Sequence, residues 1–166
     1  MMFTDKGREL IFELSNEAFT EALAERLARM AEPGDVFTLI GDLGAGKTVF
    51  ARAFVRARCD EKEEVPSPTF TLLQTYDSGD VTIYHFDLYR INHAEEALEL
   101  GIEEAFADGI TLIEWGERLG PLLPANRLDV NLLPGKTNEA RCARLAGQGD
   151  WRTRLGEGFS EGAIHA

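Results

Sequence analysis

The sequence predicts a single α/β domain with a mixed parallel and antiparallel sheet flanked by helices. Two observations predict it. Strands alternate with helices in the first half of the chain and hairpins follow in the second half, an order typical of a mixed sheet. In addition, a short apolar run at 36–40 leads straight into a glycine-rich loop and a helical segment, the usual context of a phosphate-binding loop.

The N-terminal half is assigned by its apolar spacing. Arg8–Leu14 is expected to be a strand, and Ser15 or Asn16 to cap a helix that runs to Met30 and stops at Pro33-Gly34. Val36–Ile40 is expected to be a buried central strand. Thr48–Arg58 is expected to be a helix, since Arg56 and Arg58 suit the negative end of its dipole.

In the second half, Thr69–Tyr76 and Val81–Phe86 are predicted to form a hairpin around the turn at 77–80. Helical segments are expected at Asn92–Leu100 and Ile102–Ala107, then a strand at Ile110–Ile113 that ends in Glu114. A late hairpin is expected around Pro134-Gly135, with strands Leu128–Leu133 and Ala140–Ala146. The domain is therefore expected to span 1–146, and 147–166, with five glycines, to be a flexible or weakly packed tail.

Composition limits the classes of function. The chain has 166 residues, enough for one domain with its own core, and 17 basic against 29 acidic residues, a net charge of −12. An acidic surface repels phosphate backbones, so we expect no direct binding of DNA or RNA, and a partner with a basic patch instead. Met1–Arg8 lacks the apolar segment of a signal peptide, so we expect none there, and no apolar run reaches membrane-spanning length. With Cys59 and Cys142 far apart, reduced thiols and a cytoplasmic location are expected.

The glycine-rich loop satisfies the pattern G-x-x-x-x-G-K-[ST] in full. Its residues are Gly41, Asp42, Leu43, Gly44, Ala45, Gly46, Lys47 and Thr48. Glycines permit backbone conformations in which several N–H groups face one concavity, and the following helix adds its positive end. Lys47 is expected to contact the β- and γ-phosphates, and the Thr48 hydroxyl to bind Mg²⁺. The fold is therefore predicted to be P-loop NTPase-like.

Hydrolysis of ATP also requires a carboxylate for the metal and a polar group that orients water. Glu114 ends an apolar strand, and in a parallel strand beside Val36–Ile40 it would emerge at the same sheet edge as the loop. Asp87 is the second candidate, on one strand face with His85. Asp87 could instead be a surface acid or helix cap, and Glu114 a solvated strand end. His85 is expected to be a half-buried structural residue rather than a catalytic group, and Trp115 to pack in the core or a lid rather than stack on a base.

Four motifs, taken in this order, resemble the TsaE family. They are 41–48, Ser67-Pro68-Thr69-Phe70, the run His85-Phe86-Asp87-Leu88-Tyr89-Arg90, and Glu114-Trp115. The last three are the specific ones, since the phosphate loop occurs in many families. The resemblance covers roughly residues 10 to 146 and leaves the tail without an assignment.

The resemblance implies a Mg-ATP or Mg-ADP ligand and weak intrinsic, partner-dependent ATPase activity. It implies support of a carbamoyl-transferase and its paralogous partner, which modify an adenosine beside the tRNA anticodon, so that tRNA is contacted only indirectly. Lys47, Asp87 and Glu114 would be catalytic, and Thr48 and Glu114 would bind the metal. Ser67–Phe70 would sense the nucleotide as a switch segment. Asn16 and Thr20 would lie near the base.

Three other classes share a phosphate loop. A small-molecule or nucleoside kinase would need an acceptor site and cationic lid residues, and transfer of phosphate to a panel of acceptors would reveal it. A GTPase-like switch is disfavoured because the chain lacks Asn-Lys-x-Asp for guanine. A nucleotide-binding module without catalysis would show no single-turnover hydrolysis, with or without a partner.

Overall fold

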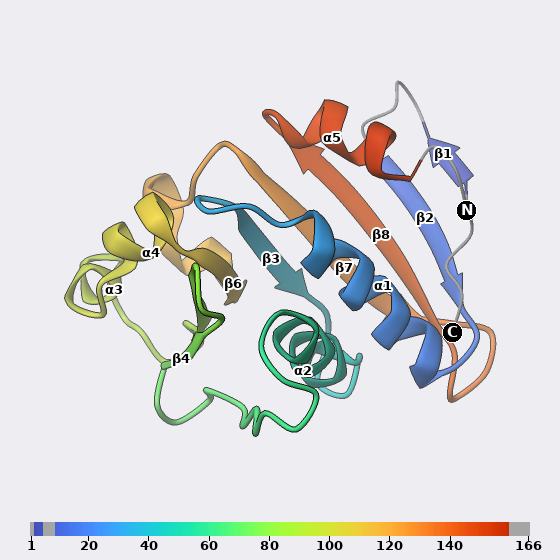
Figure 1. The fold of residues 1–166 in the computed structure, drawn as a ribbon, viewed down its shortest axis with the longest axis horizontal. Coiled ribbons are helices and arrows are strands. Elements are labelled where there is room, and N and C mark those ends of the chain that lie inside the picture. Colours follow the sequence, from blue (N-terminus) through green and yellow to red (C-terminus); the bar gives the residue numbers. More distant parts are fainter. Residues whose placement is uncertain (1, 5–8, 160–166) are drawn as a thin grey trace.

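The structure is a computed structural model that describes residues 2–4 and 9–159, and Figure 1 shows its fold. The strands are β1 (Met2–Thr4), β2 (Glu9–Leu14), β3 (Val36–Ile40), β4 (Leu73–Asp77), β5 (Thr82–Asp87), β6 (Ile110–Glu114), β7 (Arg127–Pro134) and β8 (Arg141–Gln148). The helices are α1 (Glu17–Met30), α2 (Lys47–Arg58), α3 (Glu95–Glu99), α4 (Ile102–Asp108), the 3₁₀ segment η2 (Gly116–Leu122) and α5 (Trp151–Gly158).

The described strands form one mixed sheet in the order β1-β2-β8-β7-β3-β6-β5-β4. Its centre is parallel: β3 pairs with β6 on one side and with β7 on the other, and β5 pairs parallel with β6. The outer pairs are antiparallel: β4 with β5 at one edge, and β1 with β2, β2 with β8 and β8 with β7 toward the other. The mixed sheet confirms the predicted fold class, and β6 lies parallel to β3 as expected.

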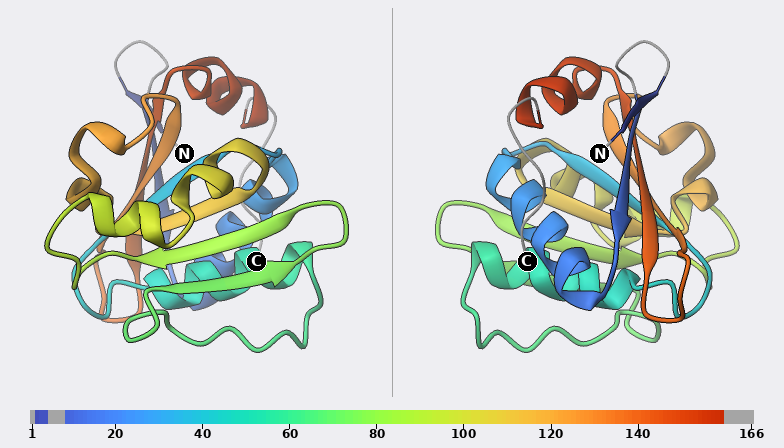
Figure 2. Two further views of the ribbon diagram at one scale, coloured as in Figure 1. Left: turned by 90° about the vertical axis from the view of Figure 1, so that its left-hand side faces the viewer. Right: turned by 90° about the vertical axis from the view of Figure 1, so that its right-hand side faces the viewer.

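Helices cover both faces of the sheet, which the turned views in Figure 2 show, with α1 and α2 on one side and η2 on the other. The larger core joins this sheet face to α1, α2 and α5, and a smaller core joins the other face to α3, α4 and η2. Because side chains alternate across a strand, Leu112 of β6 enters the larger core while Ile113 enters the smaller one. Within the described ranges, none of these helices combines the length and apolarity needed to cross a membrane.

The strand and helix on either side of the phosphate loop are held by burial. The first four residues of β3 are buried, and α2 buries Phe50 and Phe54 against the same core. Arg58, in the last turn of α2, donates hydrogen bonds of 3.2 Å to the carbonyls of Ala28 and Ala31 at the end of α1. This contact gives carbonyls at the C-terminal end of α1 a charged donor and joins the two helices.

The expectation of a loosely packed tail from 147 is wrong for residues 147–159. β8 continues to Gln148, and α5 buries Trp151 and Leu155 in the larger core, followed by Phe159. Arg154 of α5 forms two hydrogen bonds with the Asp35 carboxylate, at 2.6 and 2.8 Å. Residues 160–166, the rest of the predicted tail, lie outside the described residues.

The glycines at 147 and 149 suggest flexibility in the sequence, but in the structure they are needed for a tight turn. Gly149 has a φ of +65°, a left-handed conformation in which a larger side chain would be strained. A Cβ at Gly147 would stand 2.6 Å from the carbonyl oxygen of Trp151. These glycines therefore permit the tight turn that returns α5 to the sheet, rather than marking a flexible segment.

Two other elements differ from the prediction. The strand expected from Thr69 begins only at Leu73, because the chain turns at 68–72 and Leu72 has a φ of +67°. The helix expected from Asn92 is the short α3, for which Asn92 is not the cap; the backbone N–H of Asn92 donates instead to the Glu96 carboxylate at 2.6 Å. The remaining predicted elements are present to within one or two residues.

Candidate nucleotide-binding site

The glycine-rich loop joins the end of β3 to the start of α2, at the carboxyl edge of the parallel strands. Gly44 and Gly46 take left-handed φ values of +81° and +105°. Gly41 lies against β7, so a Cβ there would stand 2.7 Å from the Leu132 carbonyl oxygen. The loop therefore closes tightly over the strand end and requires glycine at these points. This cradle at the N-terminus of a helix suits a phosphate chain.

Lys47 and Glu114 meet at this edge. Lys47 is the first residue of α2, Glu114 is the last residue of β6, and Lys47 Nζ lies 3.6 Å from Glu114 Oε1. The other carboxylate oxygen, Oε2, lies 3.0 Å from His85 Nε2 on β5. All three side chains are largely buried. The structure thus brings together two of the predicted site residues and adds His85 to them.

His85 and Lys47 favour the ionised form of Glu114. Burial is the largest single influence and raises the pKa of Glu114, but the hydrogen bond and charge of His85, together with the charge of Lys47, outweigh it. The net result is a pKa below the ordinary range of a glutamate. Since an ionised carboxylate accepts hydrogen bonds, His85 Nε2–H is the donor in this pair.

Asp87 ends β5 beside Glu114, which is its partner in the parallel register. Its side chain is buried and accepts a hydrogen bond of 3.1 Å from the Tyr89 backbone N–H. Its own N–H donates to the Leu72 carbonyl at 2.9 Å, which ties the strand end to the segment at 67–72. Two carboxylates therefore end neighbouring strands at the same edge as the loop.

The donor atoms at this edge fit Mg²⁺ bound together with a nucleotide. The exposed Thr48 hydroxyl and the ionised Glu114 carboxylate are hard oxygen ligands, the kind that Mg²⁺ prefers. Among the described residues, no cluster of three or more His, Cys, Asp or Glu side chains could hold a metal alone. A magnesium ion here would need phosphate and water oxygens to complete its shell, as is usual for this ion.

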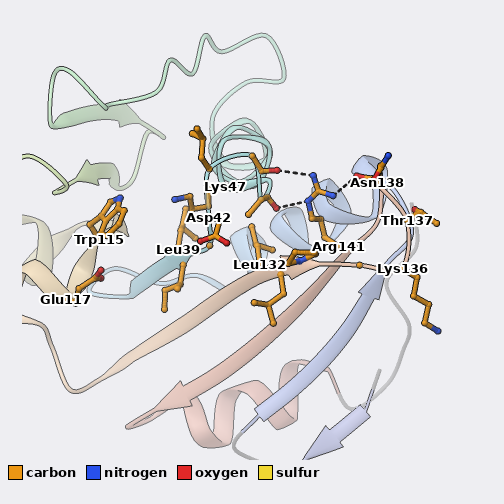
Figure 3. A pocket seen from close by; sticks show the side chains of 18 residues that line it. Leu39, Asp42, Lys47, Trp115, Glu117, Leu132, Lys136, Thr137, Asn138 and Arg141 are labelled. Carbon is orange, nitrogen blue, oxygen red and sulfur yellow. Dashed lines mark hydrogen bonds between the residues drawn. The ribbon is translucent and has the colours of Figure 1, made fainter.

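A cavity of about 680 Å³ lies beside the loop, between it and the β7–β8 hairpin (Figure 3). It is lined by Leu39, Ile40, residues 41–45, Lys47, Trp115, Glu117, residues 132–138 and Arg141. Its volume is within the usual range for small-molecule sites. The predicted site residues Thr48, Asp87 and Glu114 lie outside this lining.

Sequence reasoning missed one cation at this site and underestimated the burial of His85. Arg141 starts β8 and donates to the Gly44 and Ala45 carbonyls of the loop, at 2.9 and 3.1 Å. No local motif indicates it, because it lies 96 positions from Ala45. His85 was expected to be half-buried, but it is only 2% exposed and is hydrogen-bonded to Glu114. The alternation that groups His85 with Asp87 was the available signal.

The two residues predicted near the base have different surroundings. The Asn16 side chain accepts a hydrogen bond of 3.3 Å from Phe19 N–H and caps α1, as the sequence also predicts. Thr20 is buried on α1, with its methyl group 4.0 Å from where a Cβ on Gly46 would lie. Thr20 therefore lies against the loop. A base contact for either residue stays a prediction.

Exposed aromatic side chains surround the carboxylate edge. Trp115 directly follows Glu114 with a left-handed φ of +62°, and its ring centroid lies 4.8 Å from that of Tyr89. Arg118 lies over both rings, at 5.7 and 5.8 Å from their centroids. In the segment 67–70, Phe70 is 79% exposed beneath the Arg90 guanidinium. Trp115 is 38% exposed, so of the two expected positions it does not have the one in the core.

A phosphate loop between β3 and α2, at the edge of a mixed sheet, defines a P-loop NTPase-like α/β protein. The model of the family "Threonylcarbamoyl adenosine biosynthesis protein TsaE" matches residues 14–143. The chain therefore belongs to the TsaE family.

Named relatives agree with the family assignment. The tRNA threonylcarbamoyladenosine biosynthesis protein TsaE of Rickettsia felis is 46% identical over 130 residues, 78% of this chain and 76% of that protein. The protein of the same name from Bacillus subtilis is 40% identical over 124 residues, 74% of this chain and 77% of that protein. The crystal structure of YdiB from Bacillus subtilis has a TM-score of 0.77 and 33% identity, and the match covers 92% of this chain and 94% of that one.

Proposed function

We propose that this protein binds ATP or ADP with Mg²⁺ at the candidate site, and hydrolyses ATP slowly to support formation of threonylcarbamoyladenosine in tRNA. One observation carries the proposal: the phosphate loop, Lys47 and the two strand-end carboxylates converge at one sheet edge. Membership of the TsaE family supports the biological role.

Each residue has a separate task in this proposal. The backbone N–H groups of the loop bind phosphate oxygens, and Lys47 leaves Glu114 to contact the β- and γ-phosphates. Thr48 and the freed Glu114 carboxylate would hold the metal. Asp87, one strand further out, orients the attacking water. When bound, Mg²⁺ supplies charge neutralisation for the phosphate oxygens.

The ion pair between Lys47 and Glu114 gives each of these charges a partner when no nucleotide is bound. Two buried charges without partners would be costly, and here each neutralises the other. A Mg-nucleotide offers a phosphate anion to Lys47 and a cation to Glu114, so both side chains exchange one opposite charge for another. The side chains therefore need small movements, not a rearrangement of the sheet.

For partners, we propose a carbamoyl-transferase and its paralogous partner, with tRNA reached through them. The net charge of −12 opposes direct tRNA binding. The exposed Phe70, Tyr89 and Trp115 give a protein partner an aromatic surface beside the nucleotide. The Leu72 carbonyl accepts a hydrogen bond from the Asp87 N–H, so a γ-phosphate bound beside Asp87 would affect the neighbouring segment Ser67–Phe70. A partner that contacts this segment would then distinguish ATP from ADP. Free Cys59 and Cys142 agree with the cytoplasm as the location.

The test begins with the purified protein and then moves to cells. Calorimetry should detect Mg-ADP and Mg-ATP binding, and hydrolysis alone should be slow and rise with the transferase pair. Depletion of the protein, in cells without a second such ATPase, should lower threonylcarbamoyladenosine in tRNA measured by mass spectrometry. Normal levels of that nucleoside would reject the biological role, and phosphate transfer to a small acceptor would favour a kinase instead.

A further inference from the structure

The Arg141 guanidinium donates hydrogen bonds to backbone carbonyls on both sides of the cavity. On the loop side, Nη2 donates to Gly44 O at 2.9 Å and Nε donates to Ala45 O at 3.1 Å. On the hairpin side, Nη1 donates to the carbonyls of Asn138 and Ala140, both at 2.8 Å. Figure 3 shows the guanidinium between the loop and the hairpin. One side chain therefore joins two segments that lie far apart in the sequence.

The strand pattern explains why this arginine faces the loop. Ala143 and Leu145 on β8 enter the larger core, the same core that contains α2. Since alternate residues share a face, Arg141 projects toward α2 and the loop, whereas Arg144 projects from the opposite face. There Arg144 pairs with Glu9 at 2.8 Å.

Anchoring a carbonyl also aims the amide of the same peptide. The C=O and N–H of a trans peptide point in opposite directions in one plane. With Ala45 O held by Arg141, the N–H of Gly46 points away from Arg141, toward the inner side of the loop. Gly46 has no Cβ and would otherwise move freely between conformations. A charged donor on the Ala45 carbonyl thus orients the Gly46 N–H for an anion. The Ala45 N–H, on the peptide of the Gly44 carbonyl, donates instead to the Asp42 carbonyl at 3.0 Å and closes the turn of the loop.

We propose that Arg141 is a positioning residue for nucleotide binding. It holds the Ala45 carbonyl outward so that the Gly46 amide faces the phosphates, and it anchors the loop a second time through the Gly44 carbonyl. It also fixes the hairpin loop 135–140 across the cavity. The proposal rests on the proposed nucleotide binding at this loop. Arg141 acts through the backbone and so serves ADP and ATP alike, in contrast to an arginine that contacts the γ-phosphate.

The test compares Arg141→Ala with Arg144→Ala, which removes one positive charge from the same strand without touching the loop. Calorimetry on the full chain should show Arg141→Ala weakening Mg-ADP and Mg-ATP equally, by about 10- to 100-fold, the range for hydrogen bonds from a charged group. Arg144→Ala should bind both nucleotides like wild type. Millimolar guanidinium, but not equal sodium chloride, should restore part of the lost affinity.

A second measurement needs no nucleotide. Amide hydrogen exchange in residues 41–48 should be faster in Arg141→Ala than in wild type, and unchanged in Arg144→Ala. Should Arg141→Ala fail to fold, Arg141→Lys replaces it, because a single ammonium reaches fewer carbonyls and should give an intermediate loss.

Several results would overturn the role of Arg141. Wild-type affinity with wild-type exchange in the Arg141 variant would do so, as would a loss confined to ATP. If wild type itself binds neither nucleotide, the proposed function fails first. If wild type binds and the Arg141 variants bind equally well, only the positioning role fails.

Discussion

His85 Nε2 lies 3.0 Å from Glu114 Oε2, and the two side chains belong to neighbouring parallel strands. Both are buried, and the pair is completed by Lys47 on the other carboxylate oxygen. The acid that we propose as a metal ligand is therefore held in place before any nucleotide arrives.

Replacing Lys47 with alanine should weaken nucleotide binding. The variant removes the cation at the phosphates but keeps the backbone N–H groups, so affinity should fall by about 1.5–3 kcal/mol, as for hydrogen bonds to charged groups. Calorimetric titration with Mg-ADP and Mg-ATP measures the change. Lys62→Ala, at an exposed position, is the charge-matched control. Equal affinity in the Lys47 variant and wild type would contradict the assignment of the loop.

Substitutions of Glu114 and Asp87 should affect nucleotide binding and ATP turnover to different extents. Glu114→Gln should weaken the Mg²⁺-dependent part of nucleotide binding, whereas Asp87→Asn should reduce turnover with little effect on affinity, because its proposed role lies in the transition state. Turnover should fall by about 10²-fold in each, as for positioned acid–base groups. Steady-state hydrolysis and calorimetry at varied Mg²⁺ measure both quantities, with exposed Glu103→Gln as control. Wild-type turnover in both variants would reject the assignment.

Glu114 should also make stability depend on pH. Its pKa is lower in the folded protein than its ordinary value of 4.5, so its contribution to the free energy of unfolding is full above that value. The contribution is lost as the pH falls from 4.5 through the folded pKa. Urea unfolding from pH 7 to pH 3 should show Glu114→Gln less stable than wild type at pH 7, and the difference should shrink below pH 4.5. A constant difference would count against a lowered pKa.

Arg154→Ala should destabilise the fold while leaving the site residues unchanged. Arg154 donates to both Asp35 oxygens and to the Met30 carbonyl, and lies 3.9 Å from the Trp151 ring centroid. Loss of hydrogen bonds between charged groups should cost about 1.5–3 kcal/mol of unfolding free energy. Thermal or urea unfolding measures it, with exposed Arg152→Ala on the same helix as control. An Arg154 variant as stable as the Arg152 variant would mean that α5 is not held by this pair.

Local chemistry let the sequence predict the loop and its neighbours. The spacing of glycines, Lys47 and Thr48, an apolar strand before them and an amphipathic helix after them all lie within about twenty consecutive residues, so no tertiary contact is needed to recognise them. The same holds for Asn16 as a helix cap and for Glu114 at a strand end. Each depends on the residue and its near neighbours in sequence.

What the tertiary structure decided is which distant residues meet. His85 and Glu114 are 29 positions apart, Arg141 and Gly44 are 97 apart, and Arg154 and Asp35 are 119 apart. Alternation along a strand indicates the face of a residue, but strand order and register choose its neighbour, and a shift of one residue would reverse every face. The same limit explains the tail, whose glycines suggest flexibility until the turn into α5 is seen. The sequence by itself therefore determined the phosphate loop and the fold class, whereas the pairing of buried charges followed only from the packed sheet, because that pairing depends on contacts between segments far apart in the chain.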